Sequence, residues 1–309
     1  MILTAGLSPA WQQILVFDEV AVGEVNRAAE AVWCASGKVL NVARAVWSLG
    51  AEVDTVCPVG GLAGEAIRAE FAADGIPAHW IAADSPTRVC TTVIERANSR
   101  VTEFVENAVP IAADELAAFE AAYAAALSNA QLALLTGSLP EVIDHGKPVD
   151  LYRRLMADGP RAILDFRGPE LLEALHGRPL LVKPNRQELA VTVGRTLPDD
   201  SAVLAAMREL NNAGAEWVLI TSGPRDLLLL SRTSAWRFTP PKVDVVNPIG
   251  CGDCLAAGIA VAIDDGAEMV DAVRFGMAAA ADNLEQLLPA RLSRDRVGPS
   301  ADRVHVEPF

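Results

Sequence analysis

Short apolar runs alternate along most of the chain with segments whose apolar residues recur at helical spacing. The short runs predict strands at residues 53–59, 132–136, 162–165, 180–183, 217–221 and 226–231. The helically spaced segments predict helices at residues 38–49, 64–74, 113–128, 149–158, 186–193, 201–213, 252–263 and 269–287. This alternation predicts an α/β fold, in which helices cover both faces of a mainly parallel sheet.

Two stretches break the alternation, at residues 11–33 and 88–106, and both have the composition of extended strands. The second predicts a hairpin that turns at residues 97–100 (ANSR). No linker, low-complexity tract or internal repeat divides the chain, so we expect residues 1–309 to form one domain with a substantial core.

The chain is acidic, with a formal net charge of −14 at pH 7. This charge disfavours a nucleic-acid partner, because a phosphate backbone requires a cationic face.

The chain begins without a basic segment, so no secretory signal is evident. The long uncharged run at residues 121–140 contains Asn129, Gln131, Gly137 and Pro140, and it predicts a helix followed by a strand rather than a membrane span. We therefore expect a cytoplasmic protein with no membrane partner.

The five cysteines do not suggest a disulfide framework, because their number is odd and the chain is long. Cys251 and Cys254 form a Cys-x-x-Cys pair at a predicted helix start, which leaves a redox or zinc interpretation open. Zinc would need a second pair of Cys or His ligands, and thiol exchange would need a thioredoxin-like βαβ unit. The sequence shows neither, so we interpret Cys251 as a small residue between two glycines.

The most informative stretch of the chain is residues 247–254 (NPIGCGDC), which precede an apolar helix. Glycines let the backbone turn tightly and bring its N–H groups close to a ligand. At the positive end of a helix, such a loop favours an anion. A carboxylate in the same turn suits phosphoryl transfer, because it can take a proton from the attacking hydroxyl. Helix capping is the alternative role for Asp253.

Three further motifs directly follow predicted strands. They contain Ser138 after residue 136, Asn185 after residue 183, and Gly223 after residue 221. In open α/β sheets, ligands gather beyond the carboxyl ends of the strands. Each motif alone is typical of an ordinary strand-to-helix turn, but their joint occurrence indicates a shared site. The P-loop motif Gly-x-x-x-x-Gly-Lys-Ser/Thr does not occur, which excludes a P-loop kinase.

Residues 247–254 resemble the C-terminal signature of the ribokinase-like (PfkB) carbohydrate kinases, in the form found in the branch of tagatose-6-phosphate kinase and 1-phosphofructokinase. Similar pieces follow the family's order over almost the whole chain: residues 25–27 (VNR), 37–42 (GKVLNV), 59–61 (VGG), 87–88 (TR), 137–140 (GSLP) and 183–189 (KPNRQEL). The resemblance implies an α/β/α sandwich with a small β-sheet lid, formed by residues 11–33 and 88–106. In that family the lid closes the sugar site and often mediates dimerisation, which implies a homodimer.

The resemblance also implies roles at the phosphoryl-transfer end. Asp253 would be the general base, and the N–H groups of the loop would stabilise charge on the transferred group. The loop residues expected to act in catalysis with Asp253 are Gly250, Cys251 and Gly252.

Asn185 and Glu188 lie three residues apart at a predicted helix start, and in the resembling family such a pair organises Mg²⁺ and its waters. An N-capping arrangement of the two residues is the alternative. The residues expected around the nucleotide are Lys183, Asn185, Thr221, Gly223 and Asn283.

On the sugar side, the resemblance implies a clamp for a phosphate that the substrate already carries, formed by Arg27, Lys38 and Arg88. A solvated surface charge is the alternative for each of them. The other residues expected at the sugar are Gln12, Gly37, Asn41 and Ser138.

The departures from the family pattern gather on the sugar side. Gln12 stands where the family has an Asp that binds sugar hydroxyls, and residues 36–39 (SGKV) replace Gly-Gly-Lys-Gly. Residues 165–168 (DFRG) bring a further cation, Arg167, toward the pocket. The identity of the substrate therefore does not follow from the resemblance.

The resemblance implies a carbohydrate kinase that uses ATP and Mg²⁺ and phosphorylates an alcohol group. The expected substrate is a small sugar, a ketohexose monophosphate such as fructose 1-phosphate, fructose 6-phosphate or tagatose 6-phosphate. Two alternatives stay open. One is a kinase of an unphosphorylated sugar, nucleoside or sugar acid, and the other is a weakly catalytic regulator that binds a nucleotide or a sugar phosphate.

Overall fold

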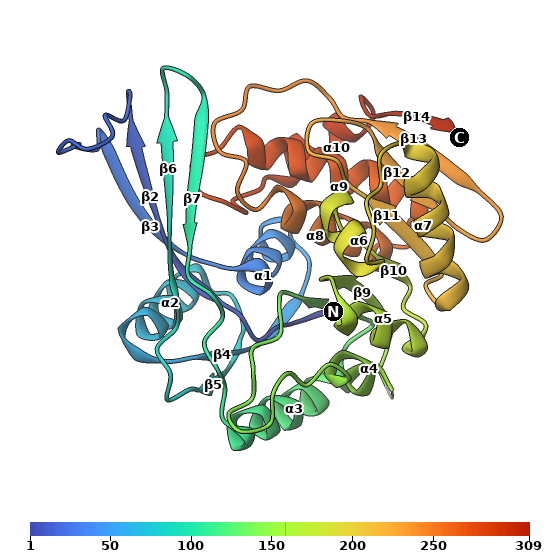
Figure 1. Ribbon diagram of the computed structural model, residues 1–309, viewed down its shortest axis with the longest axis horizontal. Helices are drawn as coiled ribbons and strands as arrows, with labels where there is room; N and C mark the ends of the chain where they lie inside the picture. Colours follow the sequence, from blue (N-terminus) through green and yellow to red (C-terminus); the bar gives the residue numbers. More distant parts are fainter. Residues whose placement is uncertain (158) are drawn as a thin grey trace.

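The computed structural model describes residues 1–157 and 159–309. In these residues the chain forms a ten-stranded central sheet and a separate four-stranded sheet (Figure 1). The helix predicted at residues 149–158 is observed only at Leu151–Met156, and its predicted last residue, Asp158, lies outside the described residues. No helix of the described residues is both long and apolar enough to cross a membrane.

The central sheet is mainly parallel, as the alternating pattern predicts. Its strands, in sheet order, are β14 (His305–Pro308), β13 (Ala235–Thr239), β12 (Leu227–Leu230), β11 (Trp217–Ile220), β10 (Leu181–Val182), β9 (Arg161–Asp165), β8 (Leu132–Thr136), β1 (Ile2–Ala5), β4 (Val53–Val59) and β5 (His79–Ala82). All pairs from β5 to β11 are parallel, and β12, β13 and β14 extend the sheet with antiparallel pairs. β1 and β8 are buried along their whole length, as parallel strands between two layers of helices require.

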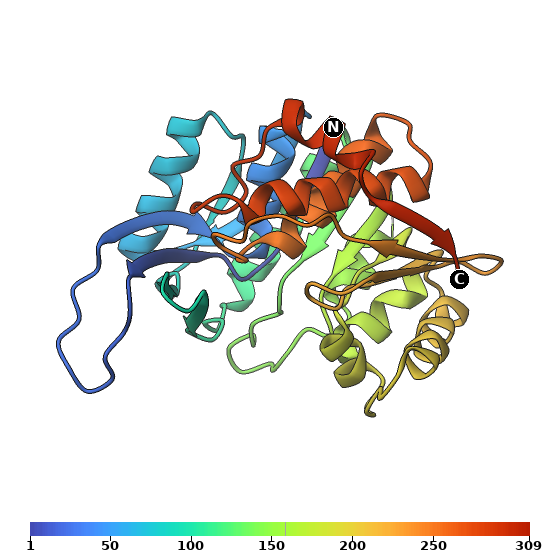
Figure 2. The same cartoon turned by 90° about the horizontal axis from the view of Figure 1, so that it is seen from above.

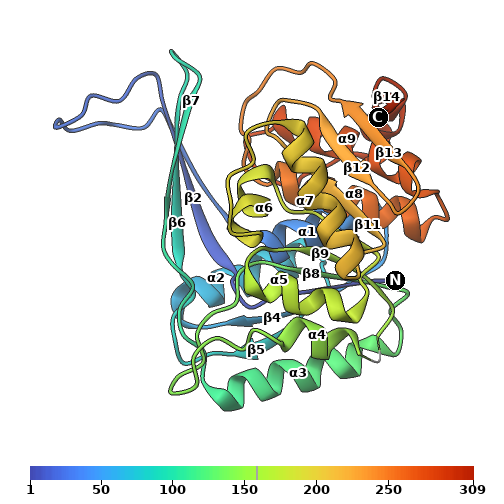
Figure 3. The ribbon, with the colours of Figure 1, turned by 45° about the vertical axis from the view of Figure 1, so that its right-hand side comes forward.

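Helices cover both faces of this sheet, and each face has its own apolar core (Figures 1 and 3). One layer contains α1 (Lys38–Ser48), α2 (Gly61–Asp74), α8 (Cys251–Asp264), α9 (Met269–Leu284) and α10 (Arg294–Ala301). The other contains α3 (Ala113–Leu127), α4 (Leu151–Met156), α5 (Pro169–Ala174), the 3₁₀ turn η1 (Leu175–Gly177), α6 (Arg186–Thr192) and α7 (Asp200–Ala213). In α7 the buried residues Val203, Ala206, Met207 and Leu210 recur at the spacing of a single helix face.

The four-stranded sheet, which we call the lid, stands beside the central sheet (Figure 2). In sheet order its strands are β3 (Glu30–Ser36), β2 (Ala10–Phe17), β6 (Val89–Glu95) and β7 (Arg100–Val105). β6 and β7 form the predicted hairpin, and Ser99 in its turn has a φ of 52°. The loop between β2 and β3 extends away from the rest of the molecule (Figures 2 and 3).

Several observed helices and strands differ from those that the apolar pattern predicts. α9 stops at Leu284 instead of residue 287, because the N–H groups of Val246 and Asn247 donate to the carbonyl oxygen of Leu284 at 2.7 and 3.2 Å. The sequence predictions lack β1, β5, β13, β14, α5 and α10. β5 and β14 are the edge strands of the central sheet, where exposed residues interrupt the apolar run. β1 has only four residues, which is too few for a periodic signal.

Helices α8 and α9 pack backbone against backbone. A Cβ atom added to Gly258 of α8 would lie 2.7 Å from Cα of Gly276 in α9 and 2.9 Å from Cβ of Ala279. α8 begins within residues 247–254, which we call the glycine loop, so this close packing helps to fix the position of the loop.

Gly258→Ala is expected to destabilise the fold by about 1–3 kcal/mol, because the added methyl group overpacks the contact between α8 and α9. Gly298→Ala in α10 is the matched control, since no atom lies within 4 Å of its Cβ position. The control should be neutral or slightly stabilising. Urea unfolding followed by circular dichroism measures both variants, and equal stabilities would contradict the expectation.

Candidate active site

A cavity of about 930 Å³ lies between the lid and the carboxyl ends of the central strands. Its wall comes from segments far apart in the sequence, including all four strands of the lid and the first turns of α1, α6 and α8. The predicted site residues in this wall are Gln12, Gly37, Lys38, Asn41, Arg88, Lys183, Asn185, Glu188, Thr221, Gly223, Gly250, Cys251, Gly252 and Asp253. Among the residues that the structure describes, the predicted Arg27, Ser138 and Asn283 are not part of it.

The glycine loop forms the start of α8. Gly250 caps the helix with a φ of 79°, a left-handed conformation that favours glycine. The N–H group of Cys251 donates to the carbonyl oxygen of Pro248 at 3.3 Å. The N–H groups of Gly250, Gly252 and Asp253 have no acceptor in the described part of the chain. They are therefore available to an anion at the positive end of the helix.

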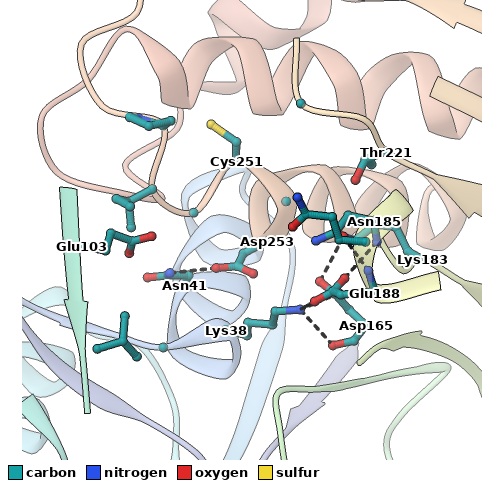
Figure 4. Close-up of a pocket in the computed structure, with 18 of the residues that line it drawn as sticks. Lys38, Asn41, Glu103, Asp165, Lys183, Asn185, Glu188, Thr221, Cys251 and Asp253 are labelled. Carbon is teal, nitrogen blue, oxygen red and sulfur yellow. Dashed lines mark hydrogen bonds and ion pairs between the residues drawn. The ribbon is translucent and has the colours of Figure 1, made fainter. Parts of the chain in front are cut away.

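Asp253 lies in the first turn of α8 and is 7% exposed. Its Oδ2 atom accepts a hydrogen bond from Nδ2 of Asn41 at 2.8 Å (Figure 4). The hydroxyl of Ser36 donates to Oδ1 of Asn41 at 3.2 Å, which fixes the orientation of that amide. Burial and the nearby charge of Asp165 raise the pKa of Asp253 to about 7. A carboxylate with this pKa can accept a proton efficiently near neutral pH.

A buried group of opposite charges lies beside Asp253 (Figure 4). Asp165, at the end of β9, is 1% exposed, and its carboxylate lies 2.9 Å from Nζ of Lys38 and 3.0 Å from Nζ of Lys183. Burial alone would raise the pKa of Asp165, but the two ammonium groups outweigh it and lower that pKa. Burial likewise opposes the charge on Lys38, but Asp165, Glu188 and Asp253 raise the pKa of Lys38 above its usual value. The site therefore holds fixed positive charge.

Asn185 and Glu188 adopt the N-capping arrangement at the start of α6. The N–H group of Glu188 donates to Oδ1 of Asn185 at 2.8 Å, and the N–H group of Asn185 donates to Oε2 of Glu188 at 2.8 Å. This arrangement leaves the other carboxylate oxygen of Glu188, Oε1, at 3.4 Å from Nζ of Lys38. Among the described residues, no group of three or more Cys, His, Asp or Glu side chains could hold a metal ion. A metal ion here would need further oxygen ligands from water or a nucleotide.

The structure does not bring the three residues of the predicted phosphate clamp together. Arg88 donates to three backbone carbonyl oxygens, at distances of 2.9–3.2 Å. Lys38 faces carboxylates, as described above. Arg27 is exposed in the loop between β2 and β3, which extends away from the rest of the molecule (Figures 2 and 3).

The remaining sugar-side residues lie in two places. Gln12 is 4% exposed, and its side-chain amide donates to Oγ1 of Thr92 on β6 at 2.9 Å. Ser138 lines a second cavity of about 470 Å³, which shares Lys38, Arg88 and Glu188 with the first.

On the nucleotide side, Thr221 and Gly223 follow β11 and face the cavity. Asn283 has a different environment from the predicted one, because it is 1% exposed and lies under the glycine loop. Its side-chain amide donates to the carbonyl oxygen of Ile249 at 2.8 Å and accepts from the N–H group of Ala290 at 2.7 Å. These contacts make Asn283 a support of the loop.

Sequence reasoning assigned no role to several residues of the wall, and two ionisable ones among them are Asp165 and Glu103. Asp165 ends a predicted strand, and this position at a carboxyl end is the signal that could have identified it. Glu103 points from β7 into the cavity (Figure 4), and burial raises its pKa. No local motif marks Glu103, because its position depends on the pairing of β7 with β6.

Comparison with known proteins agrees with this geometry. Residues 12–291 match the pfkB family of carbohydrate kinases. The 1-phosphofructokinase of Haloferax volcanii is 32% identical over 278 residues, which are 90% of this chain and 88% of that protein. Phosphofructokinase-2 from Escherichia coli, in complex with fructose-6-phosphate, superposes with a TM-score of 0.85 at 27% identity, over 98% of this chain and 97% of that chain.

A ribokinase from Arabidopsis thaliana, complexed with ribose and ATP, shares the fold with a TM-score of 0.75 at 21% identity, over 97% of this chain and 98% of that chain. The predicted ribokinase-like architecture is therefore confirmed. The family match spans almost the whole chain, from β2 to the segment after α9, and includes the glycine loop and Asp253. On this evidence the chain belongs to the pfkB family of carbohydrate kinases.

Proposed function

We propose that this kinase transfers the γ-phosphate of ATP to a hydroxyl group of a ketohexose monophosphate. The observation that carries the proposal is Asp253, a buried carboxylate with a pKa of about 7 in the first turn of α8, beside the unused N–H groups of the glycine loop. Membership of the family supports a carbohydrate acceptor, and the names of two relatives support a sugar phosphate.

In the proposed reaction, Asp253 takes the proton of the attacking hydroxyl. Asn41 holds Oδ2 of Asp253, so the other carboxylate oxygen is left to accept that proton. As the new O–P bond forms, the bond between the γ-phosphorus and the bridging oxygen of ATP breaks and ADP leaves. The N–H groups of Gly250 and Gly252 stabilise charge on the transferred phosphoryl group. Nζ of Lys183 lies 3.5 Å from the Cβ position of Gly252, so it adds positive charge beside the loop.

The residues present fit a Mg²⁺ ion that arrives with the nucleotide. Mg²⁺ prefers oxygen ligands and keeps several waters, so one carboxylate oxygen in a polar cavity is sufficient protein ligation. Oε1 of Glu188 would supply that oxygen, and the capping pair with Asn185 holds the carboxylate in place. When bound, the ion would neutralise charge on the nucleotide phosphates.

A kinase of an unphosphorylated sugar is the second candidate. Two observations favour it: Arg27 lies outside the cavity, and Arg88 donates to backbone carbonyl oxygens. The regulator without efficient catalysis has less support, because the glycine loop, Asp253 and the buried Lys38–Asp165–Lys183 group are all in place.

Release of ADP from ATP and Mg²⁺, measured with a panel of acceptors, tests the proposal. One of fructose 1-phosphate, fructose 6-phosphate and tagatose 6-phosphate should be the best substrate. Hexoses, nucleosides and sugar acids should lose roughly tenfold or more in kcat/KM, because a hydrogen bond to a charged group is worth about 1.5–3 kcal/mol. Activity on unphosphorylated acceptors alone would establish the second candidate instead.

Asp253→Asn is expected to lower kcat by about 10²–10⁴-fold, the usual contribution of a positioned base. Its melting temperature at pH 8 should not fall, because the substitution removes a buried charge whose ionisation the fold disfavours. A variant that keeps more than about a tenth of wild-type kcat would exclude the base role. ATP binding to the wild type without transfer to any acceptor of the panel would favour the regulator.

The value of kcat/KM for the sugar should rise with pH through about 7, because Asp253 must be ionised to accept the proton. Stability should respond in the opposite direction. The folded pKa is raised above the ordinary value of 3.8, so the folded state retains a proton that the unfolded chain has released. The contribution of Asp253 to stability therefore declines between about pH 4 and pH 7. A pH–rate profile with its acidic inflection below about pH 5 would contradict the assignment.

We also propose that two copies of this one-domain chain associate through their lids. Val22 and Val25 in the lid loop are 95% and 81% exposed, and Phe104 on β7 is 60% exposed. Exposed apolar side chains on a projecting loop and on the edge strand of the same sheet are typical of an interaction surface. Light scattering should give twice the chain mass of 32.7 kDa, and Val25→Asp should shift the protein toward the single chain. A single-chain mass for the wild type at every concentration would exclude the dimer.

A further inference from the structure

The second cavity lies at the carboxyl ends of β8 and β9, next to the first. The two share the side chains of Lys38, Arg88 and Glu188. A molecule whose reacting hydroxyl faces Asp253 can therefore extend past Lys38 into the second cavity.

The wall of the second cavity is cationic, although the chain as a whole has a net charge of −14. Its charged residues are the cations Lys38, Arg88, Lys147 and Arg167 and the carboxylates Glu170 and Glu188. A concave surface with excess positive charge and low-dielectric walls concentrates anions. The cavity therefore favours an anionic group on its ligand.

Arg167 differs from the other cations of this wall. Lys147 lies 3.7 Å from a carboxylate oxygen of Glu170, and the shared cations have the partners described above. Arg167 is exposed and has no ion pair or side-chain hydrogen bond within residues 1–157 and 159–309. Its guanidinium group can present two parallel N–H donors, which match the oxygens of a phosphate.

The backbone on both sides of Arg167 is held in place. The ring of Phe166 stacks on that of Tyr152, with centroids 4.1 Å apart. The N–H group of Gly168 donates to Oγ1 of Thr192 at 2.9 Å in a buried hydrogen bond. The backbone at Arg167 is therefore held by its neighbours. When a ligand binds, only the side chain of Arg167 has to become ordered.

We propose that Arg167, together with Lys147 and the hydroxyl of Ser138, binds the phosphate that the sugar substrate already carries. This inference rests on the proposed function and names its phosphate subsite. The reacting hydroxyl occupies the first cavity, and the phosphorylated end of the sugar occupies the second. Within the same chain, Arg27 belongs to the wall of neither cavity among the described residues.

Arg167→Gln tests the subsite by steady-state kinetics with the preferred sugar phosphate. We expect its KM for that sugar to rise at least tenfold, equivalent to about 1.4 kcal/mol, while kcat changes by less than about twofold. KM for ATP should not change, and Lys147→Gln should give a smaller rise in the sugar KM. The matched control is Arg161→Gln, which removes an exposed arginine at the opposite end of β9 and should leave all constants unchanged.

Two further measurements separate phosphate binding from a structural role. The value of kcat/KM for unphosphorylated fructose should be the same in the wild type and Arg167→Gln. Inorganic phosphate should bind the wild type in a calorimetric titration and bind Arg167→Gln at least tenfold more weakly, again about 1.4 kcal/mol. An equal loss with phosphorylated and unphosphorylated sugars would overturn the subsite, and so would kinetics indistinguishable from those of Arg161→Gln.

The outcomes also separate this inference from the proposed function. A wild type that phosphorylates only unphosphorylated sugars would overturn the proposed substrate class. In that case the titration with inorganic phosphate tests by itself whether the second cavity binds an anion. Binding that is weakened by Arg167→Gln supports an anion subsite, and absence of binding to the wild type overturns it.

Discussion

The buried carboxylate of Asp165 determines how the site is arranged. It holds the ammonium groups of Lys38 and Lys183 at 2.9 and 3.0 Å, and only 1% of its own surface is exposed. Removing either lysine would leave buried negative charge less compensated, which is strongly unfavourable. The three residues come from the end of β9, the first turn of α1 and the segment after β10, so one charge group joins three elements. The same carboxylate contributes to the raised pKa of Asp253.

This arrangement means that the cations of the site are positioned before any ligand arrives. Lys183 lies beside the glycine loop, and Lys38 lies between Asp165 and Glu188. Charges that are already in place do not need to reorganise when negative charge shifts in a transition state. The buried ion group and the close packing of α8 on α9 therefore hold the two lysines and the N–H donors in fixed positions along the wall of one cavity.

The layers of the fold could be predicted because their signals are local. The runs at residues 53–59 and 132–136 coincide with β4 and β8, which are apolar because helices cover both of their faces. The glycine loop was also predictable, since its glycines and Asp253 are adjacent in the chain. The surroundings of Asp165, Glu103 and Arg27 were not. They depend on which strands are neighbours and on where a long loop extends, and neither is encoded in a short pattern.

The glycine loop contains one reactive side chain that phosphoryl transfer does not need, the thiol of Cys251. A cysteine at a helix start would ordinarily be inclined to ionise, but burial raises the pKa of Cys251 to about 11 despite the hydrogen bond from Asn283. Near neutral pH the side chain is therefore a thiol, and oxidants and alkylating agents attack thiolates. Burial therefore makes the glycine loop less reactive toward oxidants and alkylating agents than an exposed cysteine at a helix start would be.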